Sequence, residues 1–90
     1  MILLDAAAVH AALPWTVLVE ALRAAHSGAL PLADVVVQSD PSGSRNQFVT
    51  LPGWLPGGLI AVKMVGVFPG NLDLAPPQPS VQGLVAVFDG

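Results

Sequence analysis

A single lysine lies in the middle of the most apolar stretch of the chain. Lys63 follows Leu59-Ile-Ala-Val and precedes Met64-Val-Gly-Val-Phe68, and this β-branched run predicts a strand. An ammonium group among apolar side chains is costly unless an anion meets it. We therefore interpret Lys63 as a carboxylate-binding residue on a ligand-facing sheet. The alternative is that Lys63 lies on a solvated face and keeps an edge strand from pairing.

Arg45 is a second, weaker candidate for binding a substrate carboxylate. It stands beside Asn46 at the start of a predicted strand, and its guanidinium could donate two parallel hydrogen bonds to a carboxylate. The alternative is an ordinary solvated arginine at a hairpin.

The other polar residues predict no catalytic or metal site. His10 and His26 fall in the helical part without an acidic partner, so we interpret both as structural. The six acids have no metal-ligand spacing, and the absence of cysteine excludes thiolate chemistry. No glycine-rich strand–turn–helix motif for a dinucleotide occurs in these residues.

Two short helices are expected before residue 31. Asp5 precedes an alanine-rich run and can cap a helix over residues 6–13. Pro14 suits the first position of a second helix, whose apolar residues recur at i, i+3 and i+4 spacing up to His26-Ser-Gly28.

Strand patterns follow from residue 34 onward. We expect strands at 34–39, 45–51, 59–68 and 81–88, with turns at 40–44 and 52–58. The proline-rich segment 69–79 is expected to be a loop without helix. Trp54 would then lie in a loop, as a lid, as a dimer contact or simply packed. The predicted fold class is α+β, with two N-terminal helices followed by an antiparallel or mixed sheet of at least four strands, in one domain over residues 1–90.

The composition limits the partners. The net charge is −3 and the only fixed cations are Arg23, Arg45 and Lys63, which argues against nucleic acid. Hydrophobic residues make up 53% and charged residues 10%, so uncovered apolar surface and a homo-oligomer are expected. The apolar run at 6–19 is too short to span a membrane, and the N-terminus lacks the basic region of a secretory signal. We expect a cytoplasmic protein without a membrane partner.

Three segments carry a family resemblance, and they are Leu51-Pro-Gly53, Ile60-Ala-Val-Lys63-Met-Val-Gly-Val-Phe68-Pro-Gly-Asn71 and Gln82-Gly-Leu-Val-Ala-Val-Phe88-Asp89. In this order they resemble the N-terminal part of the ornithine cyclodeaminase / mu-crystallin family. The segments Leu4-Asp-Ala-Ala-Ala8 and His26-Ser-Gly28 are similar to bacterial members, including those described as pyrroline-2-carboxylate reductases.

The resemblance implies a two-domain NAD(P)-dependent oxidoreductase or deaminase. Its N-terminal part would bind the substrate and form the dimer, and a Rossmann domain would follow. Hydride transfer would interconvert a small amino acid and its imine, and Lys63 would help to hold the substrate carboxylate. We expect the 90-residue chain alone to be inactive, without catalytic residues and without a cofactor of its own. The alternative is a non-catalytic interaction module that forms homo-oligomers.

Two departures from the family pattern stand out. The family carries an arginine for the substrate carboxylate shortly after a proline, but the corresponding segment here is Pro31-Leu-Ala-Asp34, and Arg45 is not at the matching place. The family's Arg-Thr-Ala-Ala segment, its glycine-rich dinucleotide turn and the acid of the deaminase reaction are not among these 90 residues.

Overall fold

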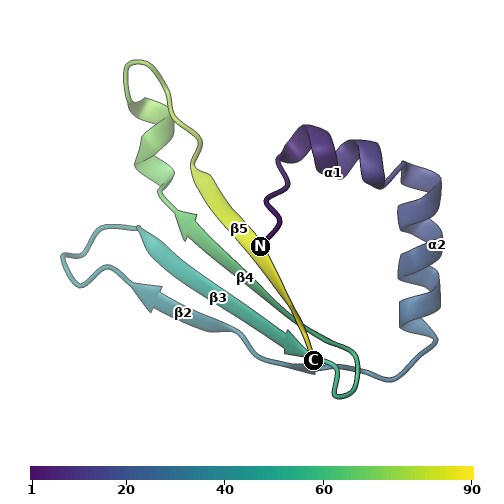
Figure 1. Ribbon diagram of the computed structural model, residues 1–90. Helices are drawn as coiled ribbons and strands as arrows, with labels where there is room; N and C mark the ends of the chain where they lie inside the picture. Colours follow the sequence, from purple (N-terminus) through teal and green to yellow (C-terminus); the bar gives the residue numbers. More distant parts are fainter. The chain divides into compact units, whose positions relative to one another are not determined.

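The computed structural model describes all of residues 1–90, which divide into two compact units, Met1–Leu30 and Pro31–Gly90. The first unit consists of helices and the second contains a β-sheet (Figure 1). The predicted α+β class is confirmed, because two helices precede an antiparallel sheet of five strands. One domain over residues 1–90 stays a prediction.

The helical unit contains α1 (Ala6–Ala12) and α2 (Trp15–His26). The Asp5 carboxylate accepts the backbone N–H of Ala8 at 2.8 Å, which is the predicted N-cap. Pro14 is the residue that precedes α2, with φ −55° and ψ 148°, and is not its first helical residue. Neither helix has the combination of length and apolar character that crossing a membrane requires.

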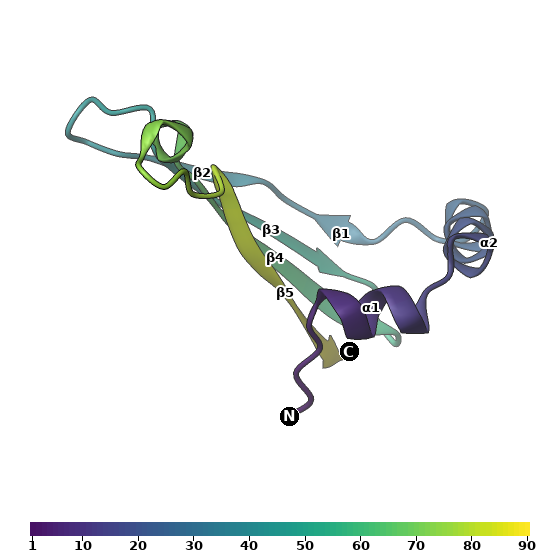
Figure 2. The ribbon, with the colours of Figure 1, turned by 90° about the horizontal axis from the view of Figure 1, so that it is seen from above.

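The sheet consists of β1 (Leu32–Ala33), β2 (Val36–Ser39), β3 (Gln47–Trp54), β4 (Leu59–Val67) and β5 (Val81–Asp89). β1 and β2 follow one another along the same side of β3 (Figure 2), β4 pairs with the other side of β3, and β5 pairs with β4. Every pairing is antiparallel, so the sheet contains no parallel strand–helix–strand unit.

The prediction of a turn over residues 52–58 is wrong in its first half, because β3 continues through Pro52 and Gly53 to Trp54. Proline has no N–H to give to a sheet and is tolerated where the ladder is interrupted. Pro52 accepts a hydrogen bond from the Asp34 N–H at 3.2 Å, at the point where β1 ends and before β2 begins. Pro52 can therefore remain within β3, because the strand beside β3 is interrupted between β1 and β2 at the position opposite Pro52.

The prediction that residues 69–79 contain no helix is also wrong. A 3₁₀ helix, η1 (Pro69–Asp73), stands beyond the end of β4 (Figure 1), with Pro69 in its first turn. A proline costs nothing there, because the N–H groups of a first turn have no partner within the helix. The Asn71 N–H donates to the Phe68 carbonyl at 3.0 Å, which closes the turn.

Both faces of the sheet are apolar. The face of Lys63 carries aliphatic side chains from three strands, including Val49, Leu51, Ala61, Val65, Val85 and Val87. The other face carries Phe48, Trp54, Ile60, Met64, Leu84 and Phe88. Only Val65 is buried, at 8% exposure. Sheets with two apolar faces are normally covered on both sides. Both faces of this sheet therefore present apolar surface against which other layers can pack.

Candidate functional site

Lys63 lies at the centre of β4, an interior strand. Its cross-strand neighbours are Leu51 on β3 and Val85 on β5. The alternative that Lys63 keeps an edge strand from pairing is therefore wrong, since β4 is paired on both sides. The other part of that alternative, a lysine on a solvated face, agrees with the exposure of Lys63. Its side chain is exposed and stands on a face of aliphatic residues.

The Lys63 ammonium has no protein anion beside it. The only ion pair of the chain joins Arg23 and Glu20 on α2, at 2.5 Å. The other charged residue within the strands is Asp89, which pairs with Leu59 at the start of β4. Four residues of strand separate Leu59 from Lys63, or about 13 Å. Lys63 is thus free to meet an anion that the chain itself does not supply.

The structure does not bring Arg45 to Lys63. Arg45 lies in the β2–β3 loop, two residues before Gln47, and Gln47 pairs with Val67 at the far end of β4. Val67 is itself four residues, or about 13 Å, from Lys63. One small carboxylate cannot contact both cations at once, so Lys63 and Arg45 do not form a single binding site.

Asp40 organises the loop that contains Arg45. The Ser42 N–H donates to its Oδ1 at 2.8 Å, and the Ser44 hydroxyl donates to its Oδ2 at 2.7 Å. The backbone hydrogen bond from Ser42, followed by the hydroxyl hydrogen bonds of Ser42 and Ser44, lowers the pKa of Asp40 from 3.8 to about 2. The carboxylate therefore serves the loop rather than a ligand.

Two residues of the family-like segments meet at one backbone carbonyl. The Asn71 side-chain amide donates to the Pro79 carbonyl at 3.0 Å, and the Gln82 amide donates to the same oxygen at 3.3 Å. The Asn71 carbonyl also accepts the Gln78 N–H at 2.9 Å. These amides close the connection between β4 and β5, so their role in the structure is to hold the loop.

The glycines of the same segments have different surroundings. A Cβ on Gly83 would collide with the backbone of β4 at Met64 and Val65. A Cβ on Gly66 would instead lie 2.5 Å from the ring of Phe68, a side chain that can move. Within the resembling segments, Lys63 alone has a polar side chain in mid-strand with no hydrogen bond or ion pair.

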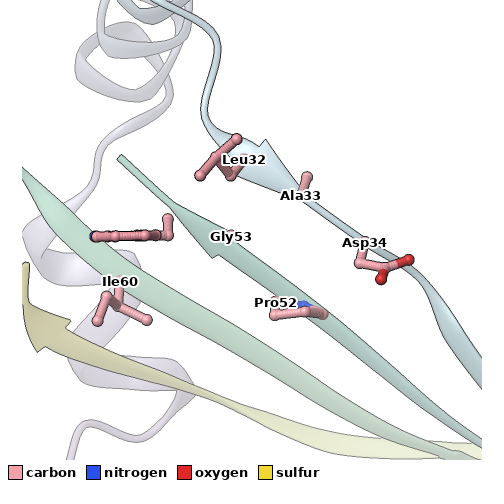
Figure 3. A pocket seen from close by; sticks show the side chains of 7 residues that line it. Leu32, Ala33, Asp34, Pro52, Gly53 and Ile60 are labelled. Carbon is pink, nitrogen blue, oxygen red and sulfur yellow. The ribbon is translucent and has the colours of Figure 1, made fainter. Parts of the chain in front are cut away.

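A shallow hollow of about 240 Å³ opens near the start of the sheet unit (Figure 3). Residues of β1, β3 and β4 and the segment after β1 line it, namely Leu32, Ala33, Asp34, Pro52, Gly53, Trp54 and Ile60. Lys63 is not among them. The prediction that Trp54 lies in a loop is wrong, because Trp54 is the last residue of β3 and pairs with Ile60.

Asp34, which lines this hollow, is a functional candidate that the sequence does not reveal. Its place in a predicted strand gave no chemical signal, because the hollow arises only when β1 pairs with β3. A second hollow lies on α2, lined by Trp15, Thr16, Val19 and Glu20.

The histidines have no catalytic arrangement. His26 lies in the last turn of α2, where its Nδ1 is 2.7 Å from the Leu22 carbonyl and so donates to it. No cluster of three or more histidines and acids that would hold a metal ion occurs in the structure.

Comparison with known proteins yields no relative: no family model, curated protein or solved structure matches the chain. The likeness to the ornithine cyclodeaminase / mu-crystallin family therefore rests on the sequence segments alone.

Proposed function

We propose that this chain is the N-terminal substrate-binding and dimerisation part of an ornithine cyclodeaminase-like, NAD(P)-dependent oxidoreductase that acts on a small amino or imino acid. The observation that carries the proposal is the single unpaired ammonium of Lys63 on an apolar face of an interior strand. Lys63 binds the substrate carboxylate in this scheme, and Arg45 remains the weaker candidate.

The surroundings of Lys63 suit a small carboxylate with an apolar body. Leu51 and Val85 flank the lysine across the strands, and Ala61 is the small residue two positions before it on the same face. A carboxylate at the ammonium would form charge-assisted hydrogen bonds. The aliphatic part of the ligand would cover the neighbouring side chains and so exclude water from the pair.

The dinucleotide does not fit the residues of this chain. A pyrophosphate is usually held where a strand runs into the N-terminus of a helix in a parallel sheet, and every strand pair here is antiparallel. NAD(P) would supply the hydride step from a separate domain. We expect NADH to produce no binding heat when it is titrated into the 90-residue chain. Clear affinity would contradict the proposal that a separate domain binds the dinucleotide.

A second candidate function is a non-catalytic module that forms homo-oligomers. It is favoured by the two apolar faces and by β5, which pairs only with β4 and presents a nine-residue outer edge without lysine or proline. Unpaired edges and exposed apolar surface both favour association between copies. Under either proposal the protein is a cytoplasmic homo-oligomer.

The two candidates differ in their response to a small carboxylate. We would titrate the full chain with L-proline and follow the backbone amides of β3, β4 and β5 by NMR, with prolinamide as the probe that lacks the carboxylate. The first proposal predicts shifts around Lys63 with L-proline only. Lys63→Met should weaken this binding about tenfold or more, because a hydrogen bond to a charged group contributes about 1.5–3 kcal/mol.

Matched variants distinguish a specific effect of Lys63 on L-proline binding from a general effect of the net charge. Lys63→Arg should keep most of the binding, and Arg23→Gln, which removes a cation from α2, should leave it unchanged. Arg45→Gln tests the weaker candidate in the same way. If L-proline and prolinamide act alike, or if Lys63→Met binds as the unaltered chain does, the carboxylate site is disproved. Association in analytical ultracentrifugation without any L-proline response would favour the interaction module.

A further inference from the structure

We propose that the hollow beside Trp54 binds a small primary amine with a short apolar body. The ammonium group would lie at the Asp34 carboxylate, and the apolar body would lie against Trp54 and Ile60. Figure 3 shows that the labelled lining residues come from β1, β3, β4 and the segment after β1.

The charge of the hollow is negative and unbalanced. Asp34 is its only ionisable residue, and its Oδ1 accepts the Val35 N–H at 2.7 Å. No lysine, arginine or histidine of the chain pairs with this carboxylate. A ligand that brings an ammonium group would supply the missing counter-charge, whereas a carboxylate ligand would be repelled.

The rest of the hollow is apolar and includes an aromatic ring. Trp54 pairs in register with Leu32 on one side and Ile60 on the other, and 45% of it is exposed. An indole attracts a nearby cation through its π-face and also offers a broad apolar surface. One aromatic ring and one carboxylate in an open hollow favour weak binding, in the millimolar range.

The spacing of the two groups sets the length of the ligand. The Asp34 N–H donates to the Pro52 carbonyl at 3.2 Å, so Asp34 lies beside Pro52. Trp54 is two residues further along β3, which corresponds to about 7 Å. A chain of about five or six carbons covers this distance, and hexylammonium therefore matches the hollow.

The amine site is independent of the proposed carboxylate site. Alternation along β3 and β4 puts Trp54 and Ile60 on the face opposite to Lys63. The two sites also have opposite charge. A failure of L-proline to bind at Lys63 would therefore leave the amine proposal intact, and the reverse also holds.

The test compares three ligands of equal length on the full chain. We would titrate hexylammonium, hexanol and hexanoate, and follow the Asp34 and Val35 amides and the Trp54 indole N–H by NMR. Hexylammonium should shift these signals and bind at least about fivefold more tightly than hexanol, and hexanoate should have no effect. Equal binding of hexylammonium and hexanol to the unaltered chain would overturn the proposal without any variant.

Two matched variants locate the charge. Asp34→Asn should reduce hexylammonium binding to the level of hexanol. Asp73→Asn removes the same charge from η1 and should leave hexylammonium binding unchanged. If both variants weaken binding equally, the effect is that of net charge and the site is disproved. If neither weakens it, Asp34 has no part in binding and the site is equally disproved.

Discussion

Different kinds of contact stabilise the helical unit and the sheet unit, each within itself. In Met1–Leu30 the side-chain hydrogen bonds join residues three or four positions apart, such as Asp5 with Ala8 and His26 with Leu22. In Pro31–Gly90 the strands pair over long separations, and just beyond β5 the Gly90 N–H donates to the Gly58 carbonyl, which precedes β4, at 2.9 Å. Only long-range pairing can bring together groups that are distant in sequence, and both candidate sites accordingly lie in the sheet unit.

The two units share a shortage of buried core. All large apolar residues of α2 except Leu18 are exposed, and Val65 is the only buried residue of the sheet. Hydrophobic burial is the main favourable term in folding, so we expect each unit to have a small free energy of unfolding. Small perturbations at the few specific contacts should therefore have measurable effects.

The largest effect is expected where β5 approaches β4. Gly83→Ala would drive a methyl group into the backbone at Met64 and Val65, with 3.1 Å to the Val65 Cα. Backbone cannot yield as a side chain does, so we expect a loss of about 3 kcal/mol in the free energy of unfolding. Urea denaturation followed by circular dichroism measures this loss.

Gly66→Ala is the matched control for Gly83→Ala. The atoms nearest to its new methyl group belong to the Phe68 ring, which can rotate away, and we expect a loss of about 1 kcal/mol. If the two variants are equally stable, long-range backbone contact between β4 and β5 is not what holds the sheet unit.

An intermediate effect is expected at the start of α1. Asp5→Ala removes the acceptor of the Ala8 N–H and should destabilise α1 by about 1 kcal/mol. Carbon chemical shifts of residues 6–12 report the loss of helix. Asp5→Ser retains a capping oxygen and should keep the helix, whereas equal loss in both variants would show that the cap is not the local contact that matters.

The smallest effect is expected in the β2–β3 loop. The hydrogen bonds of this loop are local, whereas the strands of the sheet pair over long sequence separations. The pKa of Asp40 is lowered to about 2 from 3.8, so its contribution to the folded loop is fully present above pH 3.8 and is lost as the pH falls through 2. An NMR titration of the Asp40 carboxyl should have its midpoint near 2. Ser44→Ala removes one donor and should raise this pKa, and an unchanged midpoint would show that the hydroxyl has no part in it.

The elements were predictable where local chemistry decides them. The Asp5 cap, the apolar period of α2 and the β-branched run of β4 all depend on neighbours in sequence, and each appears in the structure close to its expected bounds. Pro52 and Pro69 misled the prediction. The place of Pro52 depends on whether the neighbouring strand needs its missing N–H, and that strand is not adjacent in sequence. Pro69 is tolerated because the N–H groups of a first helical turn have no partner within the helix.

The sequence by itself determined the order of the elements, the excess of apolar residues and the position of one lysine in the middle of a strand. Tertiary structure alone decided that this strand is interior, that Arg45 lies away from Lys63, and that Asp34 shares a hollow with Trp54. The physical reason is that strand register is fixed by hydrogen bonds and side-chain contacts between distant residues. Periodicity tells which residues share a face, but not which strands become neighbours.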